Sequence, residues 1–127
     1  MNTGQLLLVI GALSLLSTIA LSVNRTLLDN DTMMIEAQSG VLAVSLCQGK
    51  IEENIRADFD SLSVGETVDT LFTPYSAFVC TTQVDYVEAA APSTAVTGPT
   101  SLKRVQVTVS SDYMTGAVTL SALVGDY

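Results

Sequence analysis

The feature that most constrains this chain is an uninterrupted, mostly apolar stretch from Leu6 to Val23. No charged residue precedes Arg25, and the stretch is rich in leucine, lacks proline and has one interior glycine, so the sequence predicts a helix. A run of about 18 such residues is long enough to cross a bilayer or to fill the dry centre of a helical bundle. Because the run is apolar on every side, lipid or other helices must cover all of it.

The length of 127 residues fits one small domain plus a stem. The net charge is −8, with no histidine and only five basic residues. A nucleic-acid-binding protein needs a basic face, and so does a protein that binds an anionic membrane surface, so both classes are disfavoured. The acidic groups are expected to keep the exposed part of the protein soluble.

A cleaved secretory signal fits the N-terminal stretch poorly. The stretch has no basic segment before it, it is long, and no small-x-small cleavage site stands out. We therefore expect the apolar helix to remain in the working protein.

Beyond a polar cluster at residues 29–32 the helical period continues. We predict an amphipathic helix over 31–59, with one apolar stripe at steps of three or four: Met34, Ala37, Val41, Val44, Cys47, Ile51, Ile55 and Phe59. The sequence thus divides into a hydrophobic helical stem, residues 1–28, and a globular head, residues 29–127.

The rest of the head alternates with a period of two, which is typical of strands. We predict a loop over 61–75, a strand over 78–86, a linker over 88–101, and two further strands over 102–110 and 117–124. Gly116, in the turn before the last strand, is expected to have a positive φ. The fold class is therefore α+β, with a three-stranded antiparallel sheet over 78–124 covered by the amphipathic helix, since such a sheet needs a cover to be stable.

The two cysteines are both placed at the predicted seam between helix and sheet. Cys47 lies on the apolar stripe and Cys80 on the inward face of the first predicted strand. We predict a disulfide between them, which on the chain-entropy description would stabilise the fold by about 3–4 kcal/mol. The alternative is two free, buried thiols.

An apolar N-terminal helix that runs into an amphipathic helix packed on a small antiparallel sheet resembles the type IV pilin superfamily. The segments LKRVQVTVSS and AVTLSALV are similar to the last hairpin of minor pilins and pseudopilins. The resemblance implies a structural subunit of an extracellular filament, anchored in the membrane before assembly and polymerising as a homo-oligomer. The residues expected to pack in the filament core are Gln5, Leu6, Leu8, Val9, Leu13, Leu16, Ile19, Ala20 and Val23.

Two other readings stay open. The chain could be a minor pilin or a pseudopilin of a secretion machine, or a single-span membrane protein with a small extracellular binding domain. Members of the superfamily usually carry glutamate as the fifth mature residue. If Met1 is the first mature residue, Gln5 occupies that place; a cut after Gly4 would place Val9 there. The first register is favoured, and both lack the glutamate.

No catalytic constellation appears, so we expect a protein that is not an enzyme and has no cofactor. There is no histidine to act as a base or to ligate haem. Asp58, Asp60 and Glu66 faintly resemble a calcium loop, but the spacing and the missing central glycine favour solvated acids at a helix end.

Charged and modifiable residues of the stem and the head give three further expectations. Arg25 is expected to pair with Asp29 or Asp31 of the same or a neighbouring chain, because an unpaired charge in a dry bundle is costly. Asn24 and Asn30 each begin an N-x-[ST] tripeptide, a common chance match to a glycan acceptor. In the head, Asp85 and Arg104 are expected to pair across strands.

Overall fold

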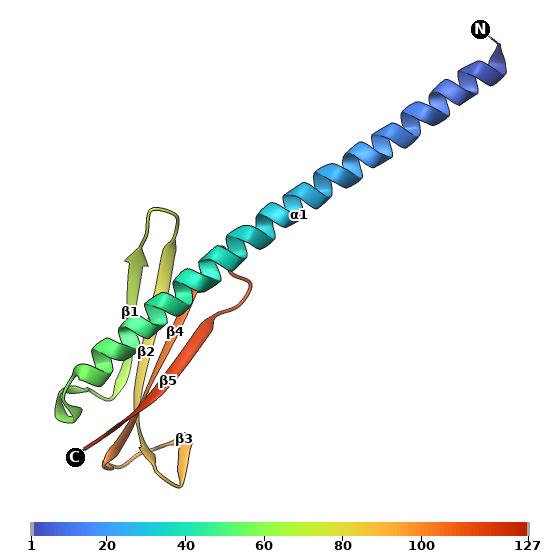
Figure 1. Cartoon of the computed structure of the whole chain (residues 1–127). Coiled ribbons are helices and arrows are strands. Elements are labelled where there is room, and N and C mark those ends of the chain that lie inside the picture. The colour runs from blue at the N-terminus through green and yellow to red at the C-terminus, as the bar shows by residue number, and fades with distance from the viewer. Residues whose placement is uncertain (1, 127) are drawn as a thin grey trace. The chain divides into compact units, whose positions relative to one another are not determined.

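The computed structural model describes residues 2–126, and they fall into two compact units, one up to Ile35 and one from Glu36 onward. The sequence analysis placed this boundary after residue 28. One long helix, α1 (Thr3–Arg56), forms the first unit and continues into the second, which also contains every strand (Figure 1). The α+β class with a long apolar N-terminal helix is confirmed.

Helix α1 begins at a capping residue and is free of proline throughout. The Asn2 side chain accepts a hydrogen bond from the Gln5 N–H at 2.9 Å, which is the role of an N-cap. At the other end Arg56 stands in the last turn, where a cation complements the helix dipole. The helix stops three residues before the predicted end, and Phe59 lies instead in a short 3₁₀ turn, η1 (Phe59–Ser61).

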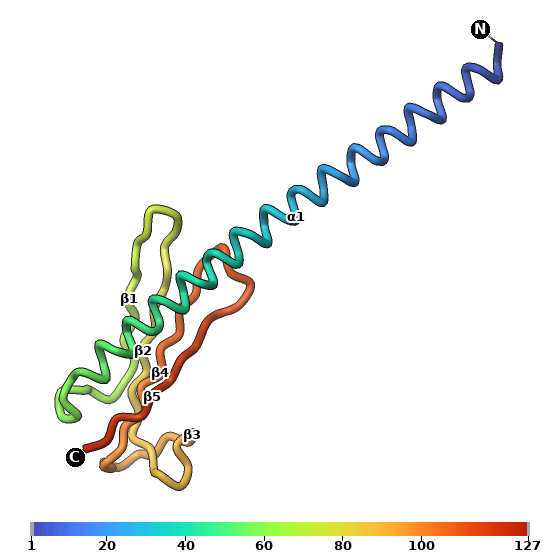
Figure 2. The backbone as a smooth tube through the Cα atoms, viewed as in Figure 1, coloured from blue at the N-terminus to red at the C-terminus, as the bar shows by residue number. Residues whose placement is uncertain are grey.

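The head contains an antiparallel sheet of five strands, not three. The strands are β1 (Gly65–Phe72), β2 (Ala77–Glu88), β3 (Ala91–Val96), β4 (Leu102–Ser111) and β5 (Val118–Gly125), as Figure 2 traces along the backbone. The order of pairing is β1-β2-β4-β5, and β3 pairs with β2 beside this path. The predicted strands correspond to β2, β4 and β5, each within two residues at either end.

The two additional strands lie in segments that were predicted to be loop and linker. Strand β1 is almost entirely exposed, so its sequence has no buried face to create a clear alternation; it forms because it pairs with β2 over its whole length. Strand β3 pairs with β2 only briefly and across a register shift. Arg104 steadies it by donating to the Ser93 carbonyl at 2.6 Å. The positive φ occurs at Gly65, the first residue of β1, and not at Gly116.

Within the head, α1 packs small residues against the sheet. Ser39, Ala43 and Cys47 are the buried residues of the helix. Ala43 and Cys47 share one hydrophobic cluster with Val105, Val107 and Val109 of β4, which are completely buried. The predicted apolar stripe is the buried face only in part: Cys47 is buried and Ile51 packs against the core, but Val41 is 71% exposed and Ile55 is 47% exposed. Small side chains allow the helix backbone to lie close to the sheet, and larger ones one step round the helix stay outside.

Lys103 is the most deeply buried charged residue in the described part of the chain, and the sequence analysis missed it. Its ammonium donates to the carbonyls of Phe59 and Leu62 at 2.7 and 2.8 Å and lies 4.2 Å from the centre of the Phe59 ring. This arrangement fastens the η1 segment to β4. The alternation of β4 could have predicted this burial, because Lys103 lies on the same inward face of the strand as Val105 and Val107.

The predicted disulfide is absent, because both cysteines are free and buried. They share one hydrophobic cluster, as expected from the seam. The Cys47 thiol, however, contacts the carbonyls of Val107 on β4 and Val118 on β5, at 3.7 and 3.5 Å, whereas Cys80 lies on β2, on the other side of β4. Burial raises the pKa of both thiols, and for Cys47 the neighbouring Cys80 raises it further.

Ion pairs connect the helix to the sheet and one strand to another. The ammonium of Lys50 on α1 lies 3.3 Å from Glu53 and 3.5 Å from Asp69 on β1. Burial alone would lower the pKa of Lys50, but the two carboxylates outweigh it, and the pKa is raised. The predicted pair of Asp85 and Arg104 is confirmed, at 3.2 Å between directly opposed residues of β2 and β4.

Candidate assembly surface on the apolar helix

The first unit presents a helix surface that is apolar and uncovered on all sides. Its large apolar side chains from Leu6 to Leu28 are each between 47% and 74% exposed. The most hydrophobic 18-residue window has a mean hydropathy of 2.5 and no buried residue. Within residues 2–126, α1 is the one helix long and apolar enough to cross a membrane. Water is a poor solvent for such a surface.

Three threonine hydroxyls on this helix are satisfied within the helix itself. Thr18 and Thr26 donate to the carbonyls of Ser14 and Ser22, four residues earlier, at 2.9 and 3.0 Å. Thr32 does the same with the Leu28 carbonyl at 2.9 Å. Such bonds remove the penalty of burying a hydroxyl in lipid or among other helices, where no water is present. The helix is therefore suited to a dry environment along much of its length.

The residues predicted to pack in a filament core are all exposed. They are Gln5, Leu6, Leu8, Val9, Leu13, Leu16, Ile19, Ala20 and Val23. They do not form one stripe, and exposed residues between them were left out of the prediction although they are equally apolar: Leu7, Ile10, Leu15 and Leu21. The whole circumference, and not one face, is the candidate surface.

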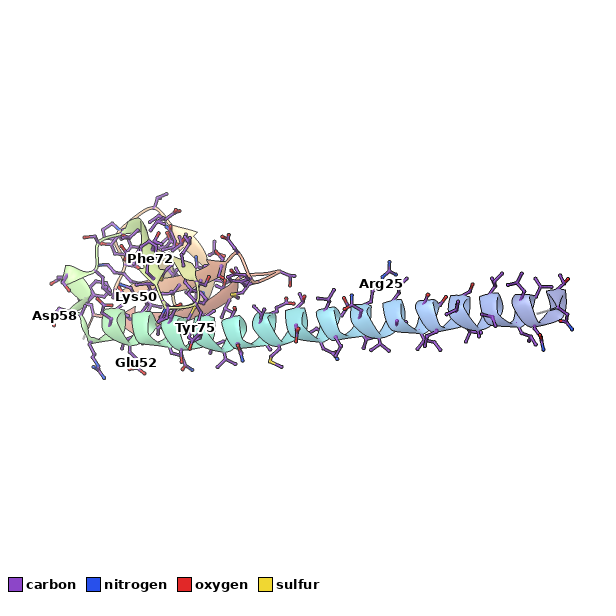
Figure 3. All side chains as sticks on the ribbon, turned by 90° about the horizontal axis from the view of Figure 1, so that it is seen from above. Arg25, Lys50, Glu52, Asp58, Phe72 and Tyr75 are labelled. Atoms are coloured by element: carbon purple, nitrogen blue, oxygen red, sulfur yellow. The ribbon has the colours of Figure 1, made fainter. Side chains whose placement is uncertain are left out.

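The charged residues above the apolar zone make no ion pair within residues 2–126. The ion pairs of the described chain do not include Arg25, Asp29 or Asp31, so the predicted pairing within one chain is not formed. Arg25 extends away from the helix (Figure 3). Pairing with a carboxylate of a neighbouring chain stays a prediction. Asn24 and Asn30 are exposed residues of the same helix.

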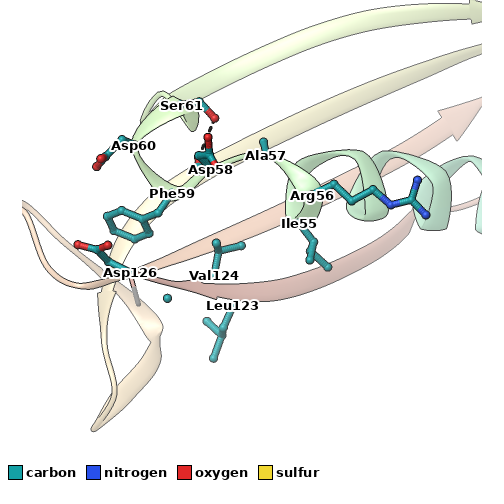
Figure 4. Close-up of a pocket in the computed structure, with 11 residues that line it drawn as sticks. Ile55, Arg56, Ala57, Asp58, Phe59, Asp60, Ser61, Leu123, Val124 and Asp126 are labelled. Atoms are coloured by element: carbon teal, nitrogen blue, oxygen red, sulfur yellow. Dashed lines mark hydrogen bonds between the residues drawn. The ribbon is translucent and has the colours of Figure 1, made fainter.

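The head has an open depression of about 860 Å³ beside the end of the helix (Figure 4). It lies between residues 55–61 and the end of β5, and three carboxylates line it: Asp58, Asp60 and Asp126. Over residues 2–126 no three potential ligand side chains gather in the way a metal ion requires. Asp58 precedes η1 and Asp60 belongs to its first turn, so these acids stand at a helix terminus.

Glu36 is a second residue whose role the sequence did not indicate. Its carboxylate accepts a hydrogen bond from the hydroxyl of Thr115, in the turn between β4 and β5. This contact joins the part of α1 that belongs to the head to the turn of the β4–β5 hairpin.

Comparison of the chain with protein-family models, with curated proteins and with solved structures finds no match. The functional argument therefore depends on the geometry and chemistry of the chain itself.

Proposed function

We propose that this protein is the structural subunit of an extracellular filament of the type IV pilus kind, which polymerises through its apolar N-terminal helix. Copies of the helix pack against one another in the filament core, and the sheet-bearing heads face the solvent. The mechanism is association, not catalysis. Before assembly the same helix holds the subunit in the membrane, because lipid and a bundle of apolar helices are similar environments.

The observation that carries the proposal is the uncovered apolar circumference of α1 from Leu6 to Leu28. Burying one large aliphatic side chain is worth about 1.5–3 kcal/mol. Thirteen such residues are exposed in this segment: Leu6, Leu7, Leu8, Val9, Ile10, Leu13, Leu15, Leu16, Ile19, Leu21, Val23, Leu27 and Leu28. Since each is about half exposed, covering them with lipid or with other helices is worth on the order of 10 kcal/mol per subunit relative to water. A bundle of like helices covers every side at once.

One observation favours a second candidate, a single-span membrane protein with a small external domain. The length and mean hydropathy of α1 satisfy the requirements of a membrane span without any partner chain. Lipid alone would then cover the helix. A minor pilin or pseudopilin is a variant of the first candidate that differs in abundance.

The discriminating experiment is electron microscopy of material sheared from the surface of producing cells, with mass spectrometry of its proteins. The proposal expects thin filaments in which this chain is the main protein. Filaments that contain the chain only in trace amounts would indicate a minor subunit. Recovery of the chain exclusively in membranes, with no filaments, would contradict polymerisation.

A further inference from the structure

The two opposite edges of the sheet in the head are formed by strands of equal length, and each of these strands is paired on one side only. Strands β1 and β5 are the outer members of the order β1-β2-β4-β5, and each has eight residues. The β5 sequence, VTLSALVG, contains no charge and no proline. Soluble proteins usually protect an outer strand with charges, proline or a covering loop, because its free N–H and C=O groups invite pairing with another chain. Strand β5 lacks both of the residue types that would prevent such pairing.

The direction of the strands decides how two copies could join. All pairings in the sheet are antiparallel, so strand direction alternates along β1-β2-β4-β5. With four strands on this path, β1 and β5 run in opposite directions. When two copies share one orientation, β5 of the first meets β1 of the second in antiparallel fashion, as in every other pairing of the sheet. The sheet can thus continue from one head into the next.

We propose that neighbouring heads are joined by pairing of β5 of one copy with β1 of the next. The inference rests on the proposed function, since subunits of a polar filament share one orientation, and it names the contact between their heads. The contact uses two different surfaces, so each copy keeps a free edge for the next one. With copies offset along the axis of a polar filament, the contact repeats as an open helix and extends along the assembly.

The distribution of charge favours this pairing over the symmetric ones. Strand β1 carries Glu66 and Asp69, so pairing two β1 strands would bring like charges together. Pairing two β5 strands joins the same surface on both copies and therefore stops at a dimer. Pairing β5 with β1 places an uncharged strand beside the acidic one and leaves a free edge for the next copy.

The alternation of side chains limits the register. Leu71 of β1 is opposite the buried Phe78 of β2, so it lies on the face that α1 covers. Val68 and Phe72 have the other parity and therefore lie on the face away from α1. On β5 that face contains Leu123, which is 49% exposed. Directly opposed residues must share a face.

One register places apolar residues opposite apolar residues on both faces. It sets Val68, which is 56% exposed, opposite Leu123 of the next copy, and Leu71 opposite Leu120. Phe72, which is 84% exposed, then lies opposite Thr119 and gains cover. A shift by two residues would place Glu66 opposite Leu123, so this alternative is less favourable.

The test is a pair of engineered cysteines, Val68→Cys with Leu123→Cys, in the full chain in producing cells. Opposed residues of an antiparallel pair have Cα atoms about 4.5–5.5 Å apart, within the range a disulfide requires. Sheared filaments are oxidised mildly and run on a non-reducing gel. The proposal expects a ladder of dimers, trimers and higher species that collapses on reduction. The native thiols are buried and stay in place.

Matched variants make the result specific. Val68→Cys with Ala122→Cys places the second thiol on the opposite face of β5 and is expected to give at least tenfold less cross-linking. Each single variant is expected to give none. A dimer from Leu123→Cys alone would show symmetric pairing of β5 and overturn the proposal, as would an equal ladder from the Ala122 variant.

A second measurement covers the case in which the cysteine pair does not fold. Leu123→Lys is expected to reduce filament yield at least tenfold, whereas Gln106→Lys, on the same face of the inner strand β4, leaves it within twofold. If the wild-type chain forms filaments but the cysteine pair gives no ladder and the two lysine variants give equal yields, the strand pairing is refuted and the proposed function stays intact. The absence of wild-type filaments refutes both.

Discussion

A charge at the middle of the apolar helix separates polymerisation from membrane anchoring. Leu16 lies near the centre of the exposed segment and is 63% exposed. In Leu16→Glu, a carboxylate buried among packed helices lacks a partner, which costs about 3–5 kcal/mol. The unassembled helix bears a cost for the same carboxylate in the bilayer, about 2.5–3.5 kcal/mol, so the association constant falls by the difference between the two costs. This difference is at most about 2.5 kcal/mol, which is about sixtyfold at 1.4 kcal/mol per factor of ten.

The same substitution leaves the membrane anchor in place. A charged residue at a bilayer centre costs about 2.5–3.5 kcal/mol on insertion scales. The twelve other large apolar residues from Leu6 to Leu28 contribute together roughly −4 to −7 kcal/mol on those scales. We therefore expect the Leu16→Glu chain in the membrane fraction.

The assay compares filament yield in sheared material with total chain in membranes by immunoblot. Leu16→Glu is expected to reduce the filament fraction about fivefold or more while the membrane fraction stays within twofold. The matched control is Gln48→Glu, which adds the same group at an exposed position of the same helix inside the head. Wild-type filament yield from Leu16→Glu would refute the packing of this helix in a dry core.

Three predictions concern the head, measured on the full chain in mild detergent. Lys103→Ala leaves the buried carbonyl of Leu62 and the partly buried carbonyl of Phe59 without this donor, and should lower the free energy of unfolding by about 2–4 kcal/mol in urea titrations. Arg56→Ala, at a side chain 83% exposed, should change the free energy of unfolding by less than about 0.5 kcal/mol; equal effects would contradict the role of Lys103. A thiol reagent should leave Cys47 and Cys80 unmodified in the native protein and modify both in denaturant, and a failure to react in denaturant would reveal a disulfide. Folding raises the pKa values of these thiols and of Lys50 above their ordinary values of 9.0 and 10.5. The stability that the protonated groups contribute is therefore complete below those values and is lost as the pH rises past them. The urea midpoint should decrease between pH 8 and pH 11, and an unchanged midpoint would contradict this.

The sequence predicts the helix and three of the strands because their patterns are strong and local. The apolar run has no breaker and no charge, and β4 alternates without a fault from Val105 to Val109. Strand β1 could not be found in this way, since it has no buried face, and its pairing with β2 is non-local.

The packing of the head depended on details that periodicity does not contain. Several faces of the helix carry apolar residues, and the sheet selects the one with Ala43 and Cys47 because those side chains are small. The seam between helix and sheet was predicted correctly, but the direction of the Cys47 thiol within it was not. The candidate assembly surface, by contrast, could be read from sequence almost completely, since it follows from composition.

The most direct test of the central claim is an electron cryo-microscopy reconstruction of filaments sheared from producing cells. The account predicts that the helix from Leu6 to Val23 lies at the filament axis, with copies of the same segment in contact on every side, and that the sheet faces solvent. A filament with the sheets at its axis, or a chain found only as a lone helix surrounded by lipid, would contradict it.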